Sequence, residues 1–280
     1  MVTSRLQKRT DAIITNVLLA LFCAIMIFPV AYVLMTSFKT KGEVLTSPPT
    51  FFPLVWSLDG YAQVFRSNML RYYLPNTLIN STASSLLVTP IAALAGYCFS
   101  RYRFRGSRAL EIAILGMMML PGLTNLIPLY RMASDLKLLS TNLVMIGVYT
   151  GGGLPFSIWI IRSFFDSIPK ELEEAALIDG ATPFEALRRI IAPLSSPGLL
   201  AAFLLNFVDT WNEFLAAVVL LSKQTAKTAT VGLLDFQSQF EVAYHVQAAA
   251  CVLIMLPVVV LFLLLRRVFF QALLEGAVKG

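Results

Sequence analysis

The chain has 280 residues and a formal net charge of +6, from 22 Lys and Arg against 16 Asp and Glu. Hydrophobic residues make up 57% of it and charged residues 14%, against about 45–50% and about 25% in soluble globular proteins. So few charges cannot cover a water-exposed surface, and we expect the apolar excess to face lipid. One His and three Cys argue against a His-rich metal site and a disulfide framework. The lack of a basic tract argues against nucleic acid as a partner.

Six apolar segments are long enough to cross a bilayer, which needs roughly 20 mainly apolar residues. In chain order they cover about 12–38, 76–100, 110–130, 143–164, 198–221 and 247–265. The first is far longer than the core of a signal peptide, so we expect it to remain as an anchor. The fourth contains Gly151, Gly152 and Gly153, which we expect either to let helices approach closely or to break the span. The sequence therefore predicts an all-α polytopic membrane protein with a single transmembrane domain over residues 1–280.

The basic residues predict the orientation, because Lys and Arg gather on the cytoplasmic side of membrane proteins. With the N-terminus inside, fourteen of the 22 Lys and Arg residues fall in inner segments. The loop from Arg101 to Arg108 is the sharpest signal, since four of its eight residues are Arg. We therefore expect a multi-pass protein of the bacterial inner membrane with both termini in the cytoplasm. An outer loop at about 39–75, with several prolines and aromatics, is expected to lie on the outer membrane surface or to cap the bundle.

An inner loop at about 165–197 begins with the pattern of a short helix. Ser167 is a candidate N-cap, and Glu171, Glu173 and Glu174 suit the positive end of the helix dipole. Gly180 permits the left-handed turn that ends such a helix.

A second short helix follows this glycine. Thr182-Pro183-Phe184-Glu185 forms a capping box with proline in the first turn, and Pro193 is expected to end the helix. The pattern alone fits either an amphipathic segment on the membrane surface or a protruding contact site for a cytoplasmic partner.

This loop carries a family resemblance. Glu174-Ala175-Ala176, then Gly180 after three residues, Ile190 after nine more, and Pro193 resemble the EAA loop of the membrane subunits of binding-protein-dependent ABC importers. Ala192 stands where that family usually has Leu. The stretches 97–106, 211–213 and 276–280 resemble segments of the same family, the last two in its carbohydrate-uptake branch, and the maltodextrin-permease type is the most similar.

The resemblance implies a role and partners for the chain. Two homologous permeases would pair over two ATPase subunits, and an external solute-binding protein would deliver a sugar, oligosaccharide or polyol-type osmolyte. The residues implied in coupling to the ATPase are Glu173, Glu174, Ala175, Ala176, Asp179 and Gly180. A further ATPase contact is implied for Val278, Lys279 and Gly280. ATP and Mg would be bound by the partner, so no cofactor is expected in this chain.

The chain lacks the motifs of an enzyme. It has no G-x-x-x-x-G-K-[ST] phosphate cradle, no H-E-x-x-H and no G-x-S-x-G, so we expect no catalytic residue and no metal site. ATP hydrolysis is expected in a partner subunit. A membrane-embedded hydrolase, a third possible function, is disfavoured by the same absences.

Polar residues interrupt the fifth apolar segment at helical spacing. Asn206, Asp209, Thr210 and Glu213 fall at i, i+3, i+4 and i+7, which predicts one shared helix face, with Asn212 beside it. A charge at mid-bilayer costs at least about 2.5–3.5 kcal/mol, so this face should meet the bundle or water. These residues either line a solute pathway or form a buried network. The alternative function, an ion-coupled secondary carrier using Asp209 and Glu213, usually shows two repeated halves, which this sequence lacks.

Overall fold

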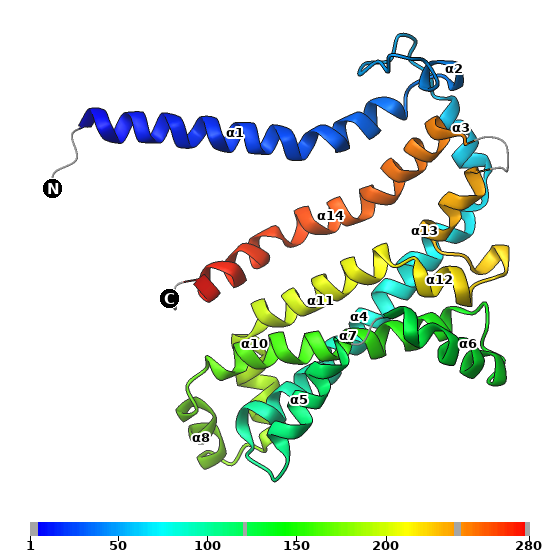
Figure 1. Cartoon of the computed structure of the whole chain (residues 1–280). Helices are drawn as coiled ribbons and strands as arrows, with labels where there is room; N and C mark the ends of the chain where they lie inside the picture. Colours follow the sequence, from blue (N-terminus) through cyan, green and yellow to red (C-terminus); the bar gives the residue numbers. More distant parts are fainter. Residues whose placement is uncertain (1–4, 120–121, 238–241, 278–280) are drawn as a thin grey trace. The chain divides into compact units, whose positions relative to one another are not determined.

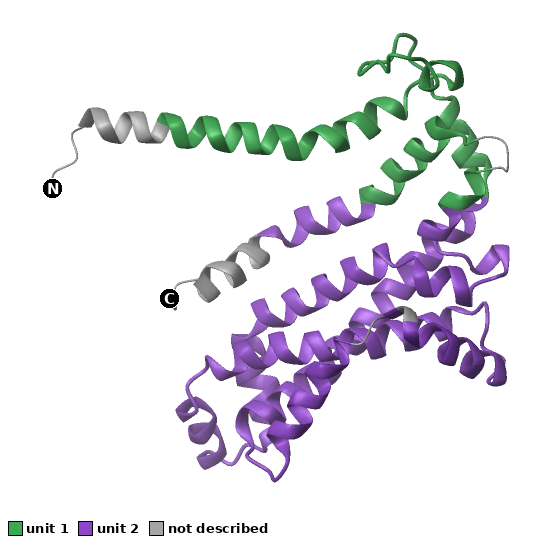
Figure 2. Ribbon diagram, viewed as in Figure 1, with its two compact units in different colours: residues 1–67, 233–256 green, residues 68–232, 257–280 purple. Residues whose placement is uncertain are grey.

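The computed structural model describes residues 5–119, 122–237 and 242–277 (Figure 1). Within these ranges the regular structure is helical, and the only β pairing is an isolated bridge between Gln237 and Val242. The prediction of an all-α polytopic protein is confirmed. The helices gather in two compact units, residues 1–67 with 233–256 and residues 68–232 with 257–280 (Figure 2). The last helix belongs to both units, and a single domain over 1–280 stays a prediction.

The first unit combines one long helix with short ones. Its elements are α1 Arg5–Thr36, α2 Lys41–Val44, α3 Asp59–Arg66, η5 Leu233–Phe236 and the first part of α14 Tyr244–Ala277. Every side chain of α1 from Ile13 to Val30 is exposed, and most of them are large and apolar. Such a surface suits a helix surrounded by lipid.

Three long helices form the frame of the second unit, namely α4 Leu74–Arg101, α7 Asn142–Asp166 and α11 Ser196–Asn212. The shorter elements are η1 Met69–Tyr73, α5 Ser107–Met117, η2 Gly122–Asn125, α6 Leu126–Asp135, α8 Glu171–Ile178, α9 Pro183–Ala186, η3 Leu187–Ile191, α10 Ala192–Leu194, α12 Leu215–Leu220, η4 Gln224–Ala226 and α13 Ala229–Gly232. One buried cluster includes Phe165 and Ile191, and another includes Met145 and Leu220. These clusters bind the short elements to the frame.

A glycine brings α7 against α11. A Cβ atom at Gly153 would lie 1.8 Å from Oδ1 of Asn206, whereas one at Gly151 or Gly152 would meet nothing within 4 Å. The expectation of close helix approach is therefore confirmed at Gly153. The helix continues through these glycines and through Pro155.

Among the described residues, four helical stretches are long and apolar enough to cross a membrane. They are Ile13–Thr36, Met69–Arg101, Asn142–Asp166 and Tyr244–Arg266. They match the predicted segments at 12–38, 76–100, 143–164 and 247–265. A fifth crossing results if Pro183–Leu194 and Ser196–Asn212, which are bent by 79° at Ser195, act as one broken span. Six crossings and cytoplasmic termini stay predictions.

The predicted segment at 110–130 does not form one continuous helix. α5 ends at Met117, and α6 begins at Leu126 after the 3-10 turn Gly122–Asn125. The sequence has Pro-Gly at 121–122, and both residue types disfavour a helix interior, proline because it lacks the N–H that the helix needs. Apolar composition alone did not reveal this break.

Two π-helices in the second unit each precede a proline. η1 ends just before Leu74-Pro75, and η3 ends just before Ala192-Pro193. The N–H of the residue before each proline donates to a carbonyl five residues back, Leu74 to Met69 and Ala192 to Leu187. A proline ring clashes with the carbonyl four residues back in an α-helix, and a π turn relieves that clash by widening the helix. The helical stretch that begins at Pro183 ends at Leu194, so the prediction that Pro193 marks the end of the inner helix is confirmed to within one residue.

Candidate functional site

The inner connection, residues 167–195, joins α7 to α11 and contains α8, α9, η3 and α10 (Figure 1). Its first helix starts at Glu171 and carries Glu171, Glu173 and Glu174 in its first turn, as predicted. The predicted N-cap role of Ser167 is wrong. Ser167 instead ends α7, and its hydroxyl donates to the Phe164 carbonyl at 2.7 Å. The extra residues up to Lys170 turn the chain before α8 begins.

A buried carboxylate fastens α8 to the end of α4. Oε2 of Glu173 lies 2.8 Å from Nε of Arg101, and its Oε1 accepts a hydrogen bond from the Tyr97 hydroxyl. Nη2 of Arg101 also donates to the Ile168 carbonyl at 3.1 Å. The Arg101 and Glu173 side chains are 6% and 9% exposed. Because an unpaired buried charge is costly, this ion pair holds the inner connection in one position on the span.

Gly180 ends α8 with a defined hydrogen-bond pattern. Its φ is +90°, its N–H donates to the Leu177 carbonyl, and the next N–H, of Ala181, donates to the Ala176 carbonyl. These two bonds form a Schellman motif, which needs a left-handed residue and favours glycine. A Cβ at Gly180 would meet nothing within 4 Å, so the requirement for glycine here is one of backbone conformation and not of space.

The predicted capping box starts α9. The Glu185 N–H donates to Oγ1 of Thr182 at 3.3 Å, and the Thr182 N–H donates to Oε2 of Glu185 at 3.0 Å. The prediction of two short helices joined at a glycine is thus confirmed.

The outward side of the inner connection mixes acidic and apolar groups. Its exposed residues include Glu174, Ala175, Leu177, Ile178, Asp179 and Phe184, and we call these six the inner contact surface. Ile178 is 85% exposed although its side chain is large and apolar. Neighbouring glutamates therefore differ, since Glu173 is buried in an ion pair while Glu174 faces outward. Ala176 is half-buried behind this surface.

A second feature is a cavity of about 650 Å³ between α7 and α11. Its polar lining comes from Ser157, Asn206, Asp209 and Asn212, with Gly152 and Gly153 on the α7 side. Asn206 is buried and its amide donates to Oγ of Ser85 at 2.9 Å, whereas Asp209 and Asn212 are exposed. Side chains that donate and accept hydrogen bonds therefore form part of the wall of a space large enough for a small solute, beside apolar residues such as Phe156 and Leu205.

Two of the predicted pathway residues do not line this cavity. The hydroxyl of buried Thr210 donates to the Asn206 carbonyl within its own helix. Glu213 lies beyond the last residue of α11, so the prediction that it shares the α11 face is wrong. Its carboxylate accepts from the N–H groups of Ala216 at 2.6 Å and Ala217 at 3.1 Å, and from the Tyr149 hydroxyl at 2.9 Å. Glu213 thus breaks the apolar segment and starts α12.

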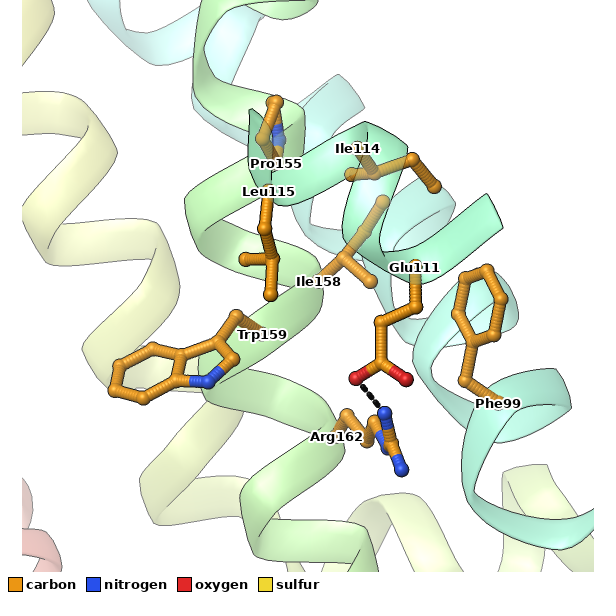
Figure 3. Close-up of a pocket in the computed structure, with 8 residues that line it drawn as sticks. All are labelled: Phe99, Glu111, Ile114, Leu115, Pro155, Ile158, Trp159 and Arg162. Atoms are coloured by element: carbon orange, nitrogen blue, oxygen red, sulfur yellow. Dashed lines mark ion pairs between the residues drawn. The ribbon is translucent and has the colours of Figure 1, made fainter. Parts of the chain in front are cut away.

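An ion pair also joins α5 to α7 beside a small apolar cavity. Figure 3 shows Arg162 of α7 directed at Glu111 of α5, and Nε of Arg162 lies 3.3 Å from Oδ2 of Asp166. The cavity has a volume of about 10 Å³, which is room for at most one water. It is a packing feature and not a ligand site.

Some predicted site residues fall outside these features. Val278, Lys279 and Gly280 lie outside the described residues. Within the part of the chain that the structure describes, no group of three or more His, Cys, Asp or Glu side chains is arranged to hold a metal ion. Sequence reasoning missed Tyr97, Arg101 and Ser85 as partners of site residues, although the first two lie in the stretch that carries the family resemblance.

Comparison with known proteins places these features in a family. A family model described as "Binding-protein-dependent transport system inner membrane component" matches residues 88–275. The inner membrane ABC transporter permease protein YcjP of Escherichia coli (strain K12) is 33% identical over 264 residues, 94% of each chain. The trehalose/maltose transport system permease protein MalG of Thermococcus litoralis is 33% identical over 276 residues, 98% of each chain.

A solved structure has the same fold. It is that of a bacterial ABC transporter involved in the import of the acidic polysaccharide alginate, with a TM-score of 0.79 over 95% of this chain and 99% of that chain, at 24% identity. The family match includes the inner connection and both helices that line the larger cavity. It favours the importer over the ion-coupled carrier. The chain therefore belongs to the family of inner membrane permease components of binding-protein-dependent ABC transport systems.

Proposed function

We propose that this chain forms half of the membrane pathway of an ATP-driven importer for a sugar, oligosaccharide or polyol-type osmolyte. A second homologous permease forms the other half, and two cytoplasmic ATPase subunits bind ATP and Mg and hydrolyse the nucleotide. An external binding protein delivers the solute, and this chain itself holds no cofactor. The trehalose/maltose permease MalG, which is 33% identical to this chain, supports the solute class.

The attachment of the inner connection is the observation that carries this proposal. Motion of an ATPase can move the pathway only through a rigid element fixed to a span. The ion pair of Glu173 with Arg101 supplies that fixation, and the outward Glu174, Ala175 and Asp179 supply the contact. Ile178 adds an apolar group that a partner would cover. In this arrangement Glu173 is a positioning residue, while Glu174 touches the ATPase.

The coupling proposal is tested by two substitutions in the inner connection. Gly180→Val forces a branched side chain into a left-handed conformation, which costs roughly 1 kcal/mol or more, and so misdirects α9. Glu174→Lys reverses the charge on the contact surface. Both variants should insert normally but lose uptake, through weaker ATPase attachment or through hydrolysis that no longer drives transport.

The measurement is ATPase activity of the reconstituted complex and its stimulation by the loaded binding protein, with maltose, trehalose and alginate oligosaccharides as test solutes. Leu263→Ile, at an exposed position of α14, is the control and should keep full coupling. Normal coupling in both inner variants would remove the coupling role and leave the connection as a surface amphipath.

The larger cavity is the proposed place of solute contact. Sugar hydroxyls both donate and accept hydrogen bonds, and Asp209, Asn206 and Asn212 offer both kinds of partner.

Asp209→Asn should change the transport rate or the preferred solute while the complex still assembles. Asp135→Asn, at an exposed position of α6 outside the cavity, is the matched control. A loss of assembled complex in Asp209→Asn, in place of a change in transport, would assign Asp209 to the structure of the bundle.

A further inference from the structure

The outer connection, residues 39–58, has an unusual distribution of side chains. Its stretch from 45 to 58 contains no charged residue. Six large apolar side chains there are between 62% and 74% exposed, namely Leu45, Phe52, Leu54, Val55, Trp56 and Leu58. We call these six residues the apolar rim. So many exposed large apolar groups in one short segment require a cover.

Two charged groups of the same connection, Lys39 and Glu43, point inward. Oε1 of Glu43 accepts hydrogen bonds from the Leu54 N–H at 2.8 Å and from the Thr50 hydroxyl at 2.9 Å. The Lys39 ammonium donates to the Thr50 carbonyl and lies 5.2 Å from the centroid of the Tyr32 ring. Glu43 and Lys39 are 7% and 2% exposed. The connection thus buries two of its charged groups while it exposes large apolar side chains, the reverse of the usual distribution in water.

The same segment folds back along the first span. The ring of Phe51 stacks on Phe28 of α1 with centroids 5.5 Å apart and lies 6.0 Å from the Tyr32 ring. α1 ends at Thr36, so at a rise of 1.5 Å per residue Phe28 and Tyr32 lie about 12 Å and about 6 Å before its end. Both belong to the stretch Ile13–Thr36 that is apolar enough to cross a membrane. The outer connection therefore reaches the depth of the bilayer.

We propose that the apolar rim inserts into the lipid leaflet at the C-terminal end of α1, the outer leaflet in the predicted orientation. The rim is continuous with the exposed apolar face of α1 through the contact of Phe51 with Phe28. Trp56 and Phe52 are of the residue types that favour the interface between hydrocarbon and headgroups. Lipid chains need no hydrogen bonds from the surface they cover, which suits a rim that offers no polar side chain.

A spin label tests the insertion. A label at Leu54→Cys, in the full chain with Cys23, Cys98 and Cys251 replaced by Ala, is measured in lipid nanodiscs after co-purification with the subunits that assemble with it. We expect more frequent collisions with oxygen, which partitions into lipid, than with a water-soluble nickel chelate. The control is a label at Gly42→Cys, which follows Lys41 in the sequence and where an added Cβ would meet nothing within 4 Å. This label should collide more often with the nickel chelate than with oxygen.

Two outcomes would overturn the proposal. Preference for the nickel chelate at Leu54 would mean that water or a soluble partner faces the rim. Low accessibility to both reagents would mean that another membrane subunit covers it.

A second measurement needs no cysteine replacement. Lipids brominated in the acyl chain should quench the part of the emission that Trp56→Phe removes, and a lack of quenching in that part would contradict insertion. The proposal does not depend on the solute or on coupling, so either can fail separately.

Discussion

The inner and outer connections each bury one glutamate, but the partners of the two carboxylates come from different distances along the chain. Glu173 receives a hydrogen bond from Tyr97, which is 76 residues away and lies on a span. Glu43 receives one from the backbone of Leu54, which is 11 residues away in the same connection. The first carboxylate therefore ties its connection to the bundle, and the second closes its connection on itself. A segment that transmits motion needs the former arrangement, and a segment that rests in lipid can be self-contained.

The largest expected loss of stability comes from breaking the ion pair between Arg101 and Glu173. Arg101→Ala leaves the Glu173 carboxylate buried without its cation, and removing one partner of a buried ion pair costs about 3–5 kcal/mol. Thermal unfolding of the purified full chain should detect this loss of stability. Arg189→Ala is the control, because Arg189 is 75% exposed and lies 3.4 Å from Glu185, and exposed pairs contribute about 0–1 kcal/mol. Equal destabilisation by both variants would break the contrast between the connections.

A smaller loss of stability is expected when only the hydrogen bond from Tyr97 to Glu173 is removed. Tyr97→Phe deletes the hydroxyl that donates to Glu173, and hydrogen bonds to charged groups contribute about 1.5–3 kcal/mol. The same unfolding measurement, combined with Arg101→Ala in a double-mutant cycle, should show coupling between the two sites. Tyr130→Phe, at an exposed position of α6, should leave stability unchanged. Simple additivity of Tyr97→Phe and Arg101→Ala would mean that the two side chains act separately.

A still smaller loss of stability is expected when the helix cap of the inner connection is removed. Thr182→Ala removes the side chain that accepts the Glu185 N–H, and such caps contribute about 1 kcal/mol. Hydrogen exchange of the amides of residues 184–186 should increase, while exchange in α4 stays as in wild type. Thr182→Ser keeps an oxygen at the same place and should behave as wild type. Faster exchange in α4 would show that the cap, and not the ion pair, holds the connection on the span.

The smallest effect is a local pH dependence in the outer connection. Burial raises the pKa of Glu43. The opposing contributions are larger together and leave the pKa below its ordinary value: they come from hydrogen bonds with the Leu54 backbone, the Thr50 hydroxyl and the Val55 backbone, and from the charge of Lys39. A lowered pKa in the folded state stabilises above the ordinary glutamate pKa of about 4.3, and the benefit is lost as pH falls through the lower folded value. Trp56 emission should report loosening in that acidic range. Glu43→Gln should remove this pH dependence, and an identical acid transition in the variant would assign it to another group.

Local patterns predicted local structure well. The capping box at Thr182 and the left-handed turn at Gly180 depend on neighbouring residues, so the sequence alone sufficed. The ion pair of Arg101 with Glu173 was not predictable, because nothing in either segment specifies the other as its partner. The same limit applies to the hydrogen bond between Asn206 and Ser85.

Apolar composition misled the prediction at two breaks. Glu213 sits at helical spacing from Asn206 and Asp209, and the apolar residues after it continue the segment. Its carboxylate nevertheless binds the N–H groups of Ala216 and Ala217, which requires a non-helical Glu213. The segment at 110–130 failed for a related reason, because hydrophobicity measures affinity for lipid and not continuity of the backbone.

The two π-helices have a consequence for insertions and deletions in the chain. A π turn contains one residue more than the α turn it replaces, so it is equivalent to a single-residue insertion. Each residue in an α-helix advances the chain by 1.5 Å and turns it by about 100°. Removing one residue between Leu187 and Ile191 would therefore leave Pro193 without its relief and rotate α10 relative to α9. At these two places, between Met69 and Tyr73 and between Leu187 and Ile191, chain length is as constrained as residue identity.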